Sequence, residues 1–233
     1  MRPLYHTIGK TLEVLKWPIS LLSLASAPAS VTCLWSELAG LFNSGAAGLR
    51  FLVGLAGYLI AWRLLFRRRG FGSLFTTFLH ELTHALMAWL TLNRVRGLKV
   101  TWSRGGHVVI SGHPHWLISL APYFVPTLSL LLISVVSAAE WVSGGPLISA
   151  LWLEVLMGAS LGLFWGALWI DLSVQQPDIQ AAGRLCALCF LPGAACLSSA
   201  AVVAVGHAAH RGALHALAAL GARWWGSLEA LLG

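Results

Sequence analysis

Apolar residues fall in long blocks along this chain. Six blocks can be drawn, each near the length of about 20 residues that a helix needs to cross a bilayer. We expect membrane-spanning helices at residues 17–35, 46–66, 71–92, 116–136, 146–170 and 182–205. The first block contains Pro18 and Pro28, and its alternative is a broken or partly re-entrant segment. Pro122 and Pro126 should kink the fourth block, because proline interrupts helical hydrogen bonding.

A polar region, residues 97–111, interrupts the apolar pattern directly after the third block. Two runs with β-branched residues flank Arg104-Gly105-Gly106, which is a hairpin signal. At the other end of the chain, leucine and tryptophan recur at helical spacing between polar residues. This stretch predicts an amphipathic helix that lies in the membrane interface, or equally one that packs on the other helices.

These elements predict an all-α polytopic membrane protein. It should have about six transmembrane helices, a small β-hairpin after the third, and a C-terminal amphipathic helix. We divide the chain into N-terminal membrane segments at 1–70, a membrane core at 71–206 and the C-terminal helix at 207–233.

The composition agrees, since 58% of the residues are hydrophobic and 10% are charged, against about 25% charged in soluble domains. The net charge of +7 comes chiefly from Arg67–Arg69 and a basic cluster at 94–104. We interpret both as topology signals and contacts with the lipid bilayer. They flank opposite ends of the third block, so they leave the orientation open. No basic, non-apolar domain is present to bind nucleic acid. Glu154, inside the fifth block, should face other helices or water.

The third block carries the candidate chemistry, because His80-Glu81-Leu82-Thr83-His84 forms an H-E-x-x-H motif. Ionisable groups at membrane depth are costly and usually functional. On a helix, His80 and His84 lie one turn apart on one face, so both imidazoles can bind one metal ion. Glu81 beside them can hold a metal-bound water. The pattern is typical of a zinc peptidase, and its alternative is a pair of core histidines hydrogen-bonded to a buried glutamate.

A catalytic zinc needs a third protein ligand, and Asp171 and Asp178 are the strongest of the eight acidic residues. Both lie between the last two blocks. Pro177 suits the first turn of a helix, which would place Asp178 beside the positive helix end. The residues alone leave both aspartates open. His113-Pro114-His115 is a further candidate, although such a pair is more typical of interfacial polar residues.

Together these residues resemble the site-2 protease-type intramembrane zinc metallopeptidases. The likeness is closest to small bacterial members without periplasmic domains, and it covers roughly residues 71–200. It rests on the H-E-x-x-H helix, the hairpin that follows, Leu-Ala-Pro-Tyr-Phe-Val-Pro-Thr at 120–127, and Gln176-Pro177-Asp178. The resemblance implies zinc held by His80, His84 and Asp178, with Glu81 as general base, in a bacterial inner membrane. Many family members carry an Asn…Pro…Leu-Asp-Gly motif at the distal aspartate, which this chain lacks, so Asp171 is the alternative ligand.

We therefore predict an intramembrane zinc metalloprotease, a metalloendopeptidase that hydrolyses membrane-protein or peptide substrates through a metal-activated water. The Gly97–Ser111 hairpin can offer a strand edge to an unwound substrate. Alternatives are a catalytically inactive peptidase-like scaffold or binding subunit with partners in the membrane, and a transporter-like protein with a buried His/Glu site.

Overall fold

The computed structural model describes residues 2–66, 71–101, 105–144, 149–172, 176–207 and 213–232. Arg67–Arg69, Arg104 and residues 208–212 lie outside this part of the chain. The topology signal at Arg67–Arg69 and the tip of the predicted hairpin therefore fall outside the described residues.

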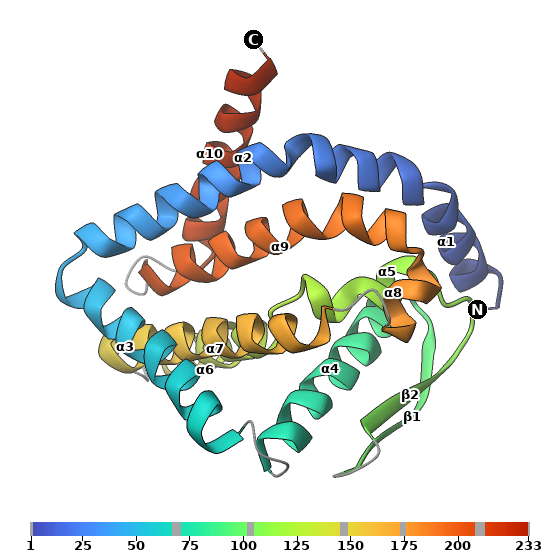
Figure 1. The fold of residues 1–233 in the computed structure, drawn as a ribbon, viewed down its shortest axis with the longest axis horizontal. Coiled ribbons are helices and arrows are strands. Elements are labelled where there is room, and N and C mark those ends of the chain that lie inside the picture. The colour runs from blue at the N-terminus through green and yellow to red at the C-terminus, as the bar shows by residue number, and fades with distance from the viewer. Residues whose placement is uncertain are drawn as a thin grey trace.

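Helices dominate the described chain, and two strands interrupt them (Figure 1). The order is α1 (Arg2–Val14), α2 (Lys16–Asn43), α3 (Ala46–Ala61), η1 (Trp62–Phe66), α4 (Phe71–Leu90), β1 (Arg94–Thr101), β2 (Gly105–Ser111), α5 (Trp116–Leu120), η2 (Ala121–Tyr123), α6 (Thr127–Ser143), α7 (Ala150–Asp171), α8 (Pro177–Ala182), α9 (Arg184–His207) and α10 (Ala213–Leu232). The predicted helical membrane class, with a hairpin after the third block, is confirmed.

Four described helices are long and apolar enough to span a membrane: α2, α3 extended to Leu64, α7 and α9. A fifth span arises if the two parts of the fourth block, bent by 83° at their break, are counted as one. The bend lies at the predicted prolines. The expected number was about six, and α4, at the third predicted block, is the predicted span that does not qualify among the described residues. Long apolar helices in this number indicate an integral membrane protein.

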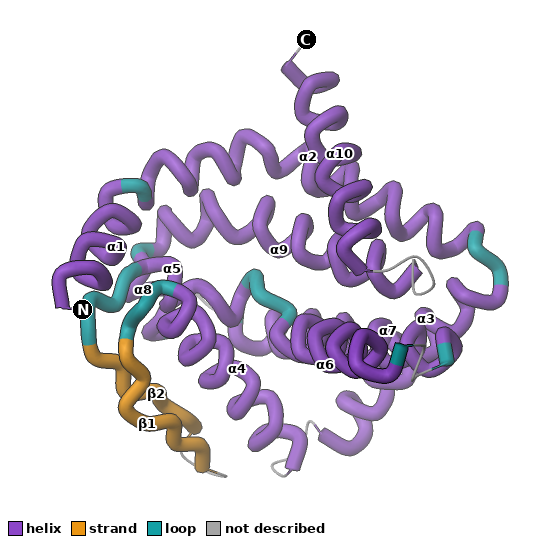
Figure 2. Tube along the Cα trace, turned by 180° about the vertical axis from the view of Figure 1, so that it is seen from behind, coloured by secondary structure: helices purple, strands orange, loops and turns teal. Residues whose placement is uncertain are grey.

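The long helices pack in pairs. α2 and α9 lie side by side in both ribbon and tube views, and α3 packs closely on α7 (Figure 1, Figure 2). A Cβ on Gly158 of α7 would lie 2.0 Å from the Phe51 carbonyl oxygen, so glycine permits this close approach. Glu154 of α7 is 1% exposed and forms an ion pair with Arg50 of α3. This confirms that Glu154 faces another helix.

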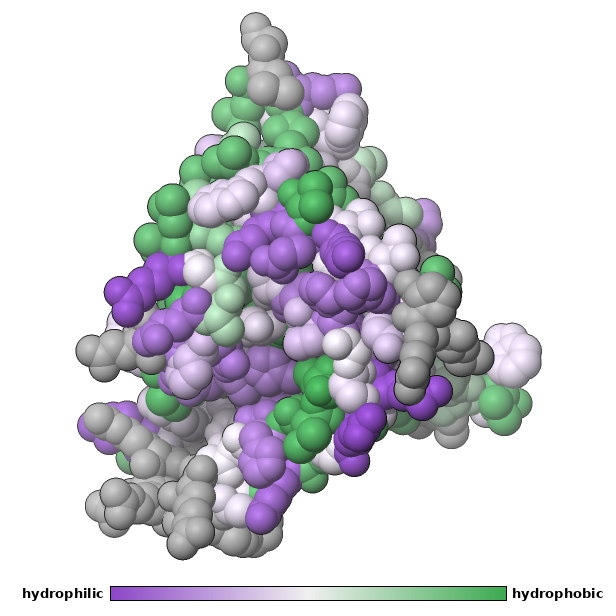
Figure 3. Space-filling model, turned by 90° about the vertical axis from the view of Figure 1, so that its right-hand side faces the viewer, coloured by the Kyte–Doolittle hydropathy of each residue, from purple (hydrophilic) through white to green (hydrophobic). Residues whose placement is uncertain are grey.

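The hairpin lies against α4, at the end of the molecule where α1 also lies (Figure 2). β1 and β2 are antiparallel, with Arg94 opposite Ser111 and Thr101 opposite Gly105. The base of the hairpin is fixed by Asn93, whose buried side-chain oxygen accepts a hydrogen bond from the His113 backbone N–H at 2.7 Å. Hydrophilic side chains gather over the middle of this end of the molecule (Figure 3).

A compact apolar cluster joins α5, η2, α8 and α9. Ile179 of α8 is 5% exposed and packs in this cluster together with buried side chains of the other elements: Trp116, Leu120, Tyr123 and Phe190. Because Ile179 is anchored there, the residue before it in the short helix α8, Asp178, is held close to α5.

The C-terminal helix α10 packs on α2 and α9 through Ala216 and Leu220. Arg223 forms an ion pair with Glu37, and the Trp224 indole N–H donates to Ser30 Oγ at 3.1 Å. The C-terminal helix was predicted either to lie in the membrane interface or to pack on the other helices. Part of α10 therefore follows the second prediction. Its far end projects beyond α2 (Figure 1).

Candidate metal centre

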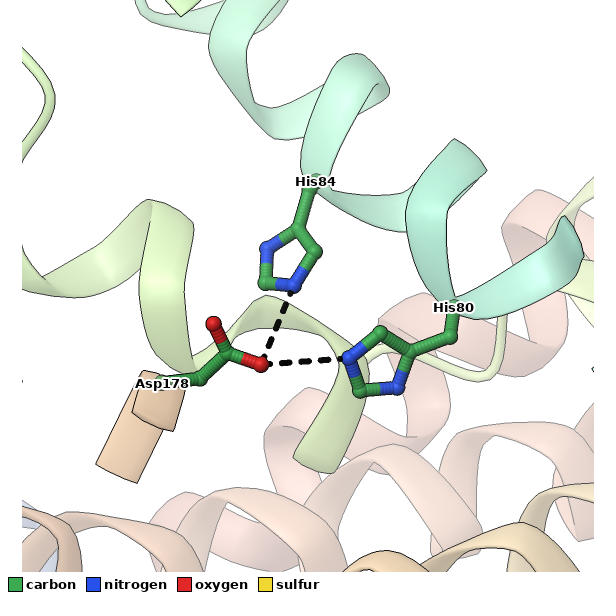
Figure 4. Close-up of side chains that lie close together, drawn as sticks. All are labelled: His80, His84 and Asp178. Atoms are coloured by element: carbon green, nitrogen blue, oxygen red, sulfur yellow. Dashed lines mark hydrogen bonds and ion pairs between the residues drawn. The ribbon is translucent and has the colours of Figure 1, made fainter. Parts of the chain in front are cut away.

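Helix α4 presents both histidines of the H-E-x-x-H motif on one face. The rings of His80 and His84 have centroids 5.0 Å apart. Both point toward Asp178, which arrives from α8 (Figure 4). The predicted spacing of one helical turn therefore brings the two imidazoles to a shared point.

Asp178 supplies a carboxylate at that point. Its Oδ2 atom lies 3.2 Å from His80 Nε2 and 3.4 Å from His84 Nε2. One ligand atom from each of the three residues lies within 4.8 Å of the others, the only such group of three among the described residues. Burial raises the pKa of Asp178, but hydrogen bonds and positive charge from His80 and His84 in their protonated forms outweigh burial and hold that pKa well below its usual range. The carboxylate is therefore ionised at neutral pH.

The other ring nitrogens are also held. His84 Nδ1 lies 2.8 Å from the Ile118 carbonyl oxygen. A carbonyl only accepts hydrogen bonds, so Nδ1 carries the proton, and Nε2 of a neutral ring turns its lone pair toward Asp178. Two acceptors facing each other repel unless a cation lies between them or the ring is protonated. This donor set, two imidazole nitrogens and one carboxylate oxygen, fits Zn²⁺.

Asp171 occupies a second position around His80. Its Oδ2 atom lies 3.5 Å from His80 Nδ1, on the side of the ring opposite Asp178. Histidines that bind metal usually donate their other N–H to a carboxylate or a carbonyl, which fixes ring orientation. The geometry thus gives the two candidate aspartates different places: Asp178 lies among the converging nitrogens, and Asp171 lies behind one of them.

Glu81 lies between the histidines and the hairpin. It is 8% exposed, and it lines a cavity of about 870 Å³ together with Thr77, His80, Gly106 and Asp171. A Cβ on Gly106 would lie 2.6 Å from Glu81 Cγ and 3.0 Å from Glu81 Oε1. Glycine at this position of β2 therefore allows the strand to pass directly over the glutamate.

We predict that Gly106→Ala displaces the Glu81 carboxylate and lowers proteolytic activity by about tenfold to a hundredfold, since small misplacements of reacting groups cost that much. Zinc content should stay unchanged, because the atoms nearest to the added Cβ belong to Glu81 and Thr77 and not to the three candidate ligands. Gly97→Ala is the matched control, since an added Cβ at Gly97 meets nothing within 4 Å. Measured cleavage rates that are equal for the two variants would contradict this reading of Gly106.

The remaining candidates lie elsewhere. The His113 ring contacts His6 of α1, with centroids 5.1 Å apart, and His115 is 4% exposed just before α5. Neither belongs to the group around Asp178.

The sequence analysis assigned no role to one residue at the centre, Tyr123. Its ring stands edge-on to His80 at a centroid distance of 5.8 Å. Its only signal was its place in the Ala-Pro-Tyr-Phe stretch.

Comparison with known proteins adds one match. A family model described as Peptidase M50B-like matches residues 51–167, about half of the chain. The matched region contains His80, Glu81, His84 and the hairpin, and it ends before Asp171 and Asp178. No curated protein and no solved structure matches the chain.

Proposed function

The chain belongs to the Peptidase M50B-like family, and from this premise we propose that it is an intramembrane zinc metalloprotease. The observation that carries the proposal is the convergence of His80, His84 and Asp178, with Glu81 one residue away from the first ligand. Three protein ligands leave a position for water, as in catalytic zinc sites. We further propose a bacterial inner membrane as its location, on the resemblance to small bacterial members.

The chemistry divides between the ion and the protein. Zinc, when bound by His80, His84 and Asp178, makes a water nucleophilic near neutral pH and polarises the scissile carbonyl. Glu81 acts as general base: its carboxylate accepts a proton from the attacking water and then gives it to the leaving amine. Asp171 and the Ile118 carbonyl hold the two imidazole rings in orientation.

The substrate must reach this site as an extended chain, because a helix hides its carbonyls in hydrogen bonds. The two-stranded sheet leaves an unpaired edge on each strand, and Gly106 of β2 lies against Glu81. An unwound segment of a membrane protein can add to such an edge by main-chain hydrogen bonds. We therefore propose membrane-protein or peptide substrates that are cleaved in an extended conformation beside the hairpin.

Metal removal tests the proposal. The purified full chain in detergent should contain about one equivalent of zinc and cleave fluorescein-labelled casein, an unfolded probe. Treatment with 1,10-phenanthroline should abolish cleavage, and added zinc should restore it where magnesium does not, because a nitrogen-rich site disfavours magnesium. Cleavage that persists in metal-free protein would contradict the proposal.

A further inference from the structure

We propose that Tyr123 is a catalytic residue that donates a hydrogen bond to the substrate carbonyl oxygen as negative charge develops on it. This inference rests on the proposed peptidase function and goes beyond the ligands and the general base. It starts from a buried phenol whose hydroxyl makes no hydrogen bond of normal geometry to any described residue.

The Tyr123 side chain is 1% exposed, yet its hydroxyl makes no hydrogen bond to any described residue. Leaving a buried polar group unpaired costs about 1–3 kcal/mol. The ring is already well placed by packing, since it lies in the apolar cluster with Ile179 and Phe190. A phenylalanine would fill the same space without this cost, so the hydroxyl suits a partner that the described residues do not supply.

The position of the phenol limits what that partner is. Tyr123 packs edge-on against His80 and lines the same small hollow as His80 and Asp171. Its hydroxyl lies toward the Asp178 carboxylate without forming a hydrogen bond of normal geometry. The unused donor is therefore beside the candidate metal ligands, and its hollow adjoins the cavity lined by Glu81 at His80 and Asp171.

The other hydroxyls around this hollow are engaged. Those of Thr83, Thr127 and Ser160 each donate to a backbone carbonyl of the chain. The acids next to His80 and His84 are Glu81, Asp171 and Asp178, which accept hydrogen bonds when ionised. An oxygen that becomes negative next to these acids needs a donor, and Tyr123 has a neutral one available.

Tyr123 also forms a boundary between two spaces. On its other side lies an apolar cavity of about 400 Å³, lined by α7, α8 and α9 residues that include Leu168, Ile179 and Leu188. The hydroxyl is thus held in low-dielectric surroundings, where a hydrogen bond to a developing charge is strongest.

The test is Tyr123→Phe, which keeps the ring and removes only the oxygen. We expect kcat for labelled casein to fall about 10²- to 10³-fold, as it does when one oxyanion donor is removed, with KM and zinc affinity unchanged. Tyr58→Phe, which removes a phenol oxygen from α3, is the matched control and should leave kcat, KM and zinc content as in the wild type.

Binding of inhibitors gives a second readout that does not depend on turnover. A phosphinic peptide carries oxygens that mimic the tetrahedral species, so Tyr123→Phe should weaken its binding by about the factor lost in kcat. A hydroxamate, which binds chiefly through the metal, should be affected by less than about threefold.

Three results would overturn the role of Tyr123. Unchanged kcat would show that the hydroxyl does not act in the reaction. A fall in zinc affinity would make Tyr123 a positioning residue for Asp178, and equal weakening of both inhibitors would exclude selective contact with the tetrahedral oxygen. Failure of the peptidase proposal itself has a separate signature, because wild-type protein would then lack zinc-dependent cleavage and would not bind the hydroxamate.

Discussion

Glu81→Gln should abolish peptide-bond cleavage while the protein keeps its zinc and its fold. The amide preserves the size and the packing of a side chain that is 8% exposed, but it cannot accept a proton from water. General acid–base groups contribute about 10²- to 10⁴-fold to rate, so kcat for labelled casein should fall by that factor. Zinc measured by mass spectrometry of the purified protein should remain at about one equivalent.

The matched control for this change is Glu13→Gln. Glu13 lies on α1, has a side chain that is 47% exposed and pairs with Lys16, so its neutralisation should leave cleavage unaltered. If Glu81→Gln cleaved casein at the wild-type rate, the enzyme interpretation would fail, and a peptidase-like scaffold would be the better account. Loss of zinc from the variant would instead assign Glu81 a structural part in the centre.

Asp178→Ala should remove most of the bound zinc, and Asp171→Ala should not. Asp178 Oδ2 lies within 3.4 Å of both Nε2 atoms, whereas Asp171 reaches only the far nitrogen of His80. Loss of an outer carboxylate typically lowers metal affinity about 10- to 100-fold, so we expect a larger loss for Asp178→Ala. Titration of metal-free protein with zinc against a competing chelator measures both values.

Asp171→Asn provides the control for this pair of variants, because the amide oxygen can still accept a hydrogen bond from His80 Nδ1. Its zinc affinity should lie between those of the wild type and Asp171→Ala. A greater loss of zinc with Asp171→Ala than with Asp178→Ala would exchange the roles of the two aspartates.

The pairing of His80 with His84 was predictable, because residues four apart on a helix share a face whatever the rest of the fold does. The hairpin was equally accessible, since β-branched runs around a glycine pair signal a turn locally. The start of α8 at Pro177, with Asp178 in its first turn, followed from the same kind of local rule.

Local sequence patterns could not decide whether Asp171 or Asp178 is the third ligand. Asp171 ends α7 and Asp178 lies in the first turn of α8, and the distance of Asp178 from His80 depends on how α8 packs. That packing is fixed by Ile179, which is buried against residues of α5, η2 and α9. Such contacts join segments far apart in the chain, and no local pattern encodes them. The place of Gly106 over Glu81 was hidden for the same reason.

The number of membrane-spanning helices was predicted less well. Hydropathy predicted about six spans, yet α4, which carries the motif, is not among the four described helices that qualify alone. The residues that make α4 a candidate functional helix also weaken its signal as a membrane helix, since ionisable side chains are costly in lipid.

The central claim is a zinc ion bound by two imidazoles and one carboxylate, and X-ray absorption at the zinc edge of the purified full chain tests it most directly. We predict about one zinc per chain, with nitrogen and oxygen ligands at about 2.0–2.2 Å, imidazole scattering from two rings and no sulfur. Spectra of the His80→Ala and His84→Ala variants should each lose scattering from one ring. Protein purified without chelator that holds no zinc, or holds it through sulfur at about 2.3 Å, would contradict the account.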